Sequence, residues 1–271
     1  MNEPSTHNEN ADLDTADDEA ARHPLAWRKR RSLGIAAAAC VAFVLLLAAA
    51  WWLISGGEVS VTAVTPPPSA SQKFAELSKE LQKSQAAEVR IADFEIDDAM
   101  LQKLAAIDRL TTIQVNITSI SPATAAKLAG MPALEQLHLR GSVINDEILL
   151  PLAKSPTIGL LNLSNTDVSP EAIENLGAMP ALRQLRLGIQ TGDNRHGRAV
   201  STLSRLRSVH LIGVYVTDEV LQMLAKMPQL ESLYLDDTAV TEAGWTWLFL
   251  NSPHLHVHID QKHHDRDPHI H

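Results

Sequence analysis

The chain has 271 residues, of which 45% are hydrophobic and 20% charged, and its formal net charge is -9 at pH 7. This length and hydrophobic share allow a sizeable core, whereas the negative charge argues against general nucleic-acid binding. Aromatic residues make up 4% of the chain, which leaves few of the stacking platforms that single-stranded nucleic acid requires.

Residues 1–31 are predicted to be a disordered cytoplasmic tail. Residues 1–26 are rich in Asn, Asp, Glu, Ala and Thr and contain almost no large apolar side chains. Such a segment buries too little apolar surface to offset the conformational entropy that is lost on ordering. Its composition fits either a solvated spacer or an acidic interaction tail.

Residues 32–55 are predicted to form a single transmembrane helix. Residues 33–54 contain no charged side chain, and at 1.5 Å per residue they span about 33 Å, slightly more than the hydrocarbon core. The four basic residues 28–31 should remain cytoplasmic, which places the following domain outside the cytoplasm. Cleavage of a signal peptide after the alanines at 48–50 is the rival interpretation. The only cysteine, Cys40, lies in this segment, so the external part can form no disulfide.

A linker and a capping helix are predicted next. Residues 56–72 contain two adjacent glycines, three consecutive prolines and small side chains, which is typical of a partly stiff linker. Residues 73–86 then place Phe74, Leu77 and Leu81 at helical spacing. A helix there would cover the open end of a repeat array, which needs a cap with a polar outer surface.

Aliphatic residues recur with a period of 24 over residues 87–260. The alternation of aliphatic and other residues at these positions predicts short strands with one buried face. Two positions separated by one residue stay aliphatic in every period: Val89/Ile91, Ile113/Val115, Leu137/Leu139, Leu161/Leu163, Leu185/Leu187, Val209/Leu211, Leu233/Leu235 and Val257/Ile259.

Helices are predicted to follow these strands. Ser121 and Ser169 supply N-cap hydroxyls, and each is followed by a proline at the first helical position, where its missing N–H costs nothing. Met-Pro pairs, as at residues 131–132, should end the helical segments. Because one such unit cannot cover its own apolar face, neighbouring units must stack into a continuous core.

The repeat resembles the leucine-rich-repeat family. In its fullest form, at residues 230–240, it reads L-x-x-L-x-L-x-x-T-x-V, and its period lies within the family range of 20 to 29. With no disulfide available outside the membrane, the chain looks most like a bacterial membrane-anchored member. The resemblance implies an α/β solenoid of about seven to eight 24-residue repeats, with a parallel sheet on the concave side and short helices on the convex side.

The side chains between the buried pairs should face outwards on the concave sheet, the surface that binding usually uses in the family this resembles. The candidate partner-binding residues on this surface are His138, Arg140, Arg186, His210 and Tyr234. A polar recognition surface and ordinary solvated strand positions are both open interpretations. The column between the buried pairs comprises Arg90, Gln114, His138, Asn162, Arg186, His210, Tyr234 and His258.

The stretch from Arg183 to Arg207, which covers one repeat and the first residue of the next, departs from the pattern. Gly192 replaces an aliphatic residue and Gly197 stands at a position that is apolar in its neighbours, so the convex side here should begin as a loop, with Val200 and Leu203 left to cover the core. Six arginines gather here, and close like charges favour an anionic partner, although each could equally be solvated or paired with a nearby acid. The further candidate partner-binding residues are Arg183, Arg195, Arg198 and Arg207.

The last region, residues 261–271, is predicted to be a histidine-rich tail. Three histidines of residues 254–258 and four of this tail could ligate zinc, copper or nickel, although their spacing matches no closed zinc motif. The chain shows no nucleophile motif, phosphate-binding loop or H-E-x-x-H pair, so we expect neither enzymatic activity nor a cofactor. The sequence favours a membrane-anchored module that recognises a protein or glycan outside the cytoplasm, with an anionic ligand as one option. Metal binding is the alternative.

Overall fold

The computed structural model describes residues 67–260 and 262–263. The predicted tail, transmembrane helix and most of the linker therefore lie outside the described residues, as does most of the histidine-rich tail. Within the described ranges, none of the helices is both long enough and apolar enough to cross a membrane.

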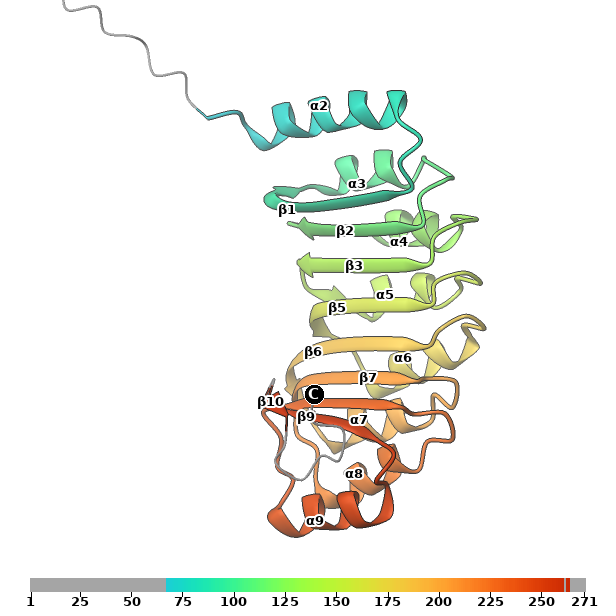
Figure 1. Cartoon of the computed structure of the whole chain (residues 1–271). Helices are drawn as coiled ribbons and strands as arrows, with labels where there is room; N and C mark the ends of the chain where they lie inside the picture. The colour runs from blue at the N-terminus through green and yellow to red at the C-terminus, as the bar shows by residue number, and fades with distance from the viewer. Residues whose placement is uncertain (1–66, 261, 264–271) are drawn as a thin grey trace, which may run out of the picture. The chain divides into compact units, whose positions relative to one another are not determined.

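One sheet runs through the described domain (Figure 1). Its strands follow the order β1-β2-β3-β5-β6-β7-β8-β9-β10, and β4 pairs with β5. All of these pairs are parallel except β9 with β10, which is antiparallel. The strands are β1 (Glu88–Ile96), β2 (Thr112–Ile117), β3 (Gln136–Gly141), β4 (Ile144–Asn145), β5 (Leu160–Asp167), β6 (Gln184–Gly192), β7 (Ser208–Val214), β8 (Ser232–Asp236), β9 (His256–Ile259) and β10 (Lys262–His263).

A short helix follows each repeat strand from β1 to β8 and packs against one face of the sheet, whereas β9 is followed by β10 (Figure 1). We call the other face of the sheet the open face. The helices are α2 (Ala70–Lys83), α3 (Asp98–Leu104), α4 (Pro122–Ala129), α5 (Asp146–Leu152), α6 (Pro170–Glu174), α7 (Asn194–Ser201), α8 (Asp218–Ala225) and α9 (Glu242–Asn251), with the 3-10 helix η1 (Asn175–Ala178) after α6.

The 24-residue spacing sets the strand register. Leu137 is the register partner of Leu161, and Leu161 that of Leu185, so residues one period apart lie side by side. Their side chains and that of Leu163, which is 0% exposed, point towards the helices and form one continuous core. The prediction of stacked strand and helix units is confirmed, and the architecture fits a leucine-rich-repeat-like fold.

Polar side chains tie the start of one helix to the start of the next. In the first example Asp98, the first residue of α3, accepts the backbone N–H of Ser121 at 2.8 Å, and Ser121 is the N-cap of α4. Burial alone would raise the pKa of Asp98, but hydrogen bonds from Thr124, Ser121 and Gln102 hold it below its usual value. Each bond satisfies a backbone N–H at a helix start and fixes the spacing of adjacent repeats. Equivalent bonds join Ser169 to Asp146, Thr217 to Asn194 and Thr241 to Asp218.

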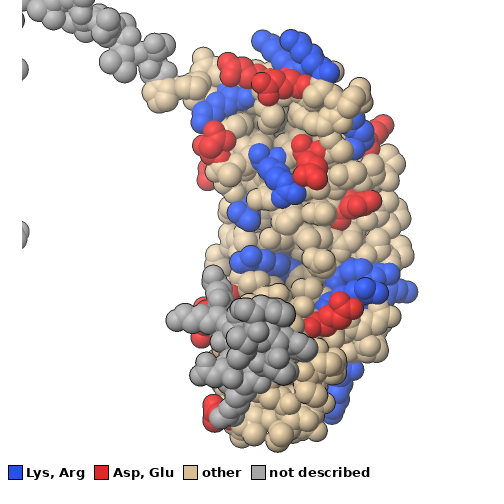
Figure 2. Space-filling view, viewed as in Figure 1, with Lys and Arg blue, Asp and Glu red and all other residues tan. Residues whose placement is uncertain are grey.

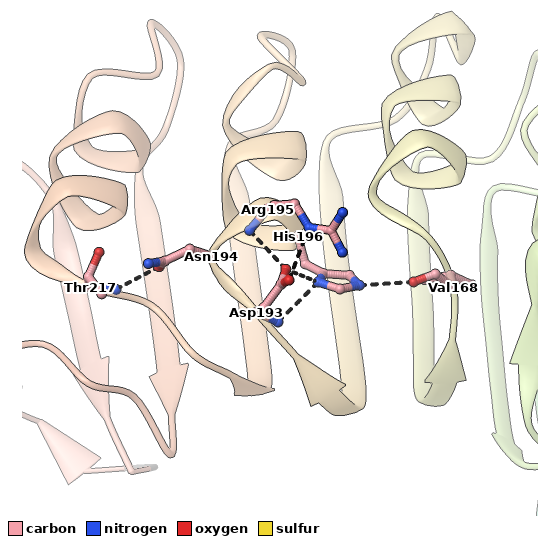
Figure 3. A network of polar contacts seen from close by, with 6 residues as sticks. All are labelled: Val168, Asp193, Asn194, Arg195, His196 and Thr217. Atoms are coloured by element: carbon pink, nitrogen blue, oxygen red, sulfur yellow. Dashed lines mark hydrogen bonds and ion pairs between the residues drawn. The ribbon is translucent and has the colours of Figure 1, made fainter.

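The loop predicted after Gly192 is wrong, because helix α7 begins at Asn194 (Figure 3). Asp193 caps it by accepting the backbone N–H of Arg195 at 2.9 Å, and His196 Nδ1 lies 3.0 Å from the N–H of Asp193. His196 is only 8% exposed, and its Nε2 lies 3.1 Å from the carbonyl oxygen of Val168 in the preceding repeat. The segment has no aliphatic side chains to pack at its start, so these polar contacts hold it in place instead.

Gly197 is a second point at which this repeat departs from the aliphatic pattern. A Cβ at this position would lie 2.6 Å from Cγ1 of Val220 in α8, so the glycine allows α7 and α8 to approach closely. Val200 and Leu203 are buried and cover the core on this side, as the sequence predicts.

Both ends of the sheet are covered. Helix α2 starts at Ala70, three residues before the predicted position, because Ser69 and Gln72 form a capping box. It buries Phe74 and Leu81 against the core, and Arg109 donates hydrogen bonds to carbonyl groups at its C-terminal end. At the other end β10, which the repeat pattern does not predict, pairs with the outer edge of β9.

Candidate functional site

The candidate site lies at the centre of the open face. His138, Asn162 and Arg186 occupy corresponding positions in β3, β5 and β6, and the register continues to His210 in β7 and Tyr234 in β8. Together they surround a hollow of about 160 Å³, whose floor includes the apolar side chain of Leu160. We call it the central hollow.

Three buried polar atoms in the central hollow have no hydrogen-bond partner among the described residues. They are Nε2 of His138, Oδ1 of Asn162 and Nε of Arg186. Asn162 is 7% exposed, and its amide nitrogen lies 3.3 Å from Nδ1 of His138. A buried polar group without a partner costs roughly 1–3 kcal/mol, so three together mark a place where a ligand would restore lost hydrogen bonds.

The environment of the central hollow keeps its first histidine neutral. Burial lowers the pKa of His138, and the positive charges of Arg140, Arg90 and Arg186 lower it further. Figure 2 shows basic side chains at intervals over the strands of the sheet. Three arginines thus place positive charge around the central hollow in a chain whose net charge is -9.

The second histidine is held by a carboxylate. Nε2 of His210 lies 2.9 Å from Oδ2 of Asp236, which is 4% exposed. Burial lowers the pKa of His210, and this effect outweighs the hydrogen bond that His210 donates to Asp236, which acts in the opposite direction. The pair fixes the orientation of the imidazole at the rim of the central hollow.

An aromatic row continues from the central hollow towards β9. Tyr234 stacks on His258 with ring centroids 4.6 Å apart, and Nε2 of His258 lies 2.7 Å from Nε2 of His256. His254 lies in the exposed turn before this strand. In the part of the chain that the structure describes, no three His, Cys, Asp or Glu residues are placed to hold a metal ion.

Four of the predicted partner-binding arginines lie away from the central hollow. Arg183 donates to the carbonyl oxygens of Pro180 and Leu182 at 2.9 Å, and it is half-buried. The other three form ion pairs with nearby carboxylates: Arg195 with Asp193, Arg198 with Glu219 and Arg207 with Glu231. Carboxylates therefore pair with three of the six arginines between residues 183 and 207.

The remaining candidates divide between the hollow and its surroundings. Arg186, His138, His210 and Tyr234 line the central hollow, whereas Arg140 is exposed at the end of β3. Asn162 was part of the outward column but was not singled out from the sequence. Its signal was the short amide side chain that the outward column places between His138 and Arg186.

Comparisons with known proteins add little to this geometry. No protein-family model and no curated protein matches the chain. Among solved structures, one described as "Leiomodin-1 Actin-Binding Site 2 (ABS2)" is similar at 15% sequence identity with a TM-score of 0.30, over 68% of this chain and 88% of that chain. That likeness supports no functional argument. The parallel sheet, its 24-residue register and the helices along one face are what relate this chain to a leucine-rich-repeat-like fold.

Proposed function

We propose that the protein is a binding module that recognises a protein or glycan ligand on the open face of its sheet. The observation that supports this proposal is the central hollow, where Asn162 is almost fully buried and its carbonyl oxygen has no partner among the described residues. Folded proteins rarely leave such atoms unpaired. Because these atoms are already removed from water in the free protein, a ligand that bonds to them does not have to desolvate them.

We further propose binding rather than catalysis. Among the contacts of the described residues, Nδ1 of His138 is engaged with Asn162, and Nε2 of His210 with Asp236. Neither contact is the pairing of a base with a hydroxyl or thiol on which nucleophilic catalysis depends.

The location of the module is a separate proposal. The uncharged segment at 32–55 and the basic residues before it predict one membrane helix with the repeats outside the cytoplasm. Protease added to intact spheroplasts should digest the repeat domain while a tag at the N-terminus stays protected. Protection of the repeats would contradict this topology, and a mature N-terminus near residue 51 would indicate cleavage.

Site-specific photo-crosslinking tests the binding surface. A benzophenone amino acid would replace Gln114, on the open face, in the full-length chain, and a matched variant would carry it at Glu147, an exposed position in α5. We expect crosslinked protein or glycan from the Gln114 variant in membrane extracts, and little from the Glu147 variant. Equal crosslinking from both positions, or crosslinking from α5 alone, would contradict the proposal.

Metal binding is the second candidate, and the contact between the Nε2 atoms of His256 and His258 is the observation that favours it. Two imidazoles are fewer than the three protein ligands of a catalytic zinc site, and the rest of the histidine-rich tail lies outside the described residues. Titration with zinc, copper and nickel, with and without residues 254–271, separates the candidates. If the full chain binds none of these metals above background, this candidate is excluded.

A further inference from the structure

The three unpaired atoms of the central hollow define what a ligand must offer. The amide nitrogen of Asn162 can only donate, so Nδ1 of His138 must accept its hydrogen. A neutral imidazole then carries its proton on Nε2, which makes that unpaired atom a donor. Nε of Arg186 is always a donor, and Oδ1 of Asn162 is an acceptor. A matching ligand therefore supplies hydrogen-bond acceptors for His138 and Arg186 and one hydrogen-bond donor for Asn162.

The charge of the central hollow restricts the acceptors further. Arg186 forms no ion pair within the described residues, whereas the other arginines of its repeat contact carboxylates or carbonyl oxygens. Asp236, the nearest acid in the aligned strands, is already bonded to His210. A ligand that accepts from Arg186 gains most if it is an anion, because hydrogen bonds between charged groups are roughly twice as strong as neutral ones.

The apolar part of the central hollow points to the neighbouring chemical group. Leu160 is half-buried and borders the hollow, so it can pack against an aliphatic side chain. A carboxylate, an N–H donor and an aliphatic side chain on adjacent atoms are the parts of the last residue of a peptide. Recognition of a terminal carboxylate is an established mode of peptide binding.

We propose that the central hollow binds the free C-terminal carboxylate of a peptide that ends in an aliphatic residue. Arg186 and His138 donate hydrogen bonds to the carboxylate, and the carbonyl oxygen of Asn162 accepts the backbone N–H of the terminal residue. This inference rests on the proposed function and specifies the ligand group at the same site.

A sugar acid offers a carboxylate beside hydroxyl donors, but the central hollow suits it less well. Sugar rings are commonly bound against exposed aromatic faces, and Tyr234, the one aromatic residue besides histidine that lines the hollow, stacks on His258. Glucuronate therefore serves as the competing ligand in the test.

The test compares an acid with its amide. The ligands are N-acetyl-Ala-Ala-Val with a free C-terminus, the same peptide with a C-terminal amide, and glucuronate, each titrated into the full-length chain in detergent micelles and followed by calorimetry. We expect the acid to bind at least about tenfold more tightly than the amide, the difference that one charge-assisted hydrogen bond supplies.

Two variants locate the binding. Arg186→Gln should weaken binding of the acid by about tenfold or more and leave binding of the amide nearly unchanged. Arg207→Gln also removes one arginine charge, at the position directly before β7 and outside the central hollow, so this variant should bind like the unmodified protein. If Arg186→Gln fails to fold by circular dichroism, Asn162→Asp replaces it. That side chain has nearly the same shape and should repel the carboxylate.

Several results would overturn the inference. These are equal affinity for acid and amide, no binding of the acid at millimolar concentration, tighter binding of glucuronate, or equal losses from Arg186→Gln and Arg207→Gln. The proposed function would survive any of them if crosslinking from Gln114 persists, whereas the loss of open-face crosslinking would refute the proposed function itself.

Discussion

Replacing Gly197 with alanine should destabilise the protein, although alanine is the better helix former. The substitution would gain about 1 kcal/mol from helix propensity. The new Cβ would however lie 2.6 Å from Cγ1 of Val220, a distance at which one of the two groups must move. Val220 is 0% exposed and β-branched, so its side chain is confined to one rotamer in α8 and has no free space. Overpacking costs about 1–3 kcal/mol, and a 2.6 Å contact with a fully buried side chain belongs in the upper part of that range, at about 2–3 kcal/mol. After the gain in helix propensity, we expect a net loss of about 1–2 kcal/mol.

Urea unfolding of the full-length chain, followed by circular dichroism, measures this loss. Gly177→Ala is the matched control, because a Cβ there meets its nearest neighbour, Leu203, at an ordinary 3.5 Å. Val220→Ala alone should cost about 2 kcal/mol through lost burial and a cavity. Combined with Gly197→Ala it should cost less than the sum, because the new methyl group then occupies vacated space. A neutral or stabilising Gly197→Ala, or strict additivity, would refute the close approach of α7 and α8.

Three further predictions concern the core, the open face and the cap of α7. Leu163→Ala should lower the free energy of unfolding in urea by about 2–5 kcal/mol. Asn162→Ala should lower it by less than about 1 kcal/mol, because this substitution also removes an unpaired oxygen. Equal losses would contradict the assignment of strand faces. The free energy of unfolding should fall as the pH drops below about 6.5, because the pKa values of His138 and His210 are lowered in the folded protein and the unfolded chain therefore binds more protons than the folded one. Replacing both histidines with glutamine should flatten this pH dependence. Asp193→Ala should cost about 1 kcal/mol at neutral pH through loss of the N-cap. Desolvation alone would raise the pKa of the Asp193 carboxyl, but the hydrogen bonds from Arg195 lower it to about 2, so the carboxyl stays charged at pH 4 and a loss that vanished there would contradict this cap.

The repeat architecture could be predicted from the sequence because burial leaves a periodic mark. Leu137, Leu161 and Leu185 lie one period apart, and the only arrangement that buries all of them places their strands side by side. Helix α7 could not be predicted in this way. It depends on the imidazole of His196 reaching a carbonyl oxygen in the preceding repeat and on a glycine facing Val220, and both contacts exist only once the neighbouring repeats have folded.

The candidate site was only partly accessible to sequence reasoning. Alternation along the strands correctly places His138 and Arg186 on the open face, since side-chain direction follows from strand geometry. The pairing of arginines with carboxylates, as between Arg198 and Glu219, depends on side chains 21 positions apart. The deep burial of Asn162 arises from the longer side chains on either side of it, and no local pattern encodes that burial.

The antiparallel strand β10 bears on how this protein behaves at high concentration. A parallel sheet built from identical units can in principle continue into another molecule, because each edge presents unpaired N–H and C=O groups. Here the outer edge of β9 is already bonded to β10, which runs in the opposite direction and comprises only two residues. A second copy that approached this edge would have to displace β10 before it could form parallel pairs with β9. The turn back after Ile259 thus protects the repeat domain against fibre-like self-association at this edge.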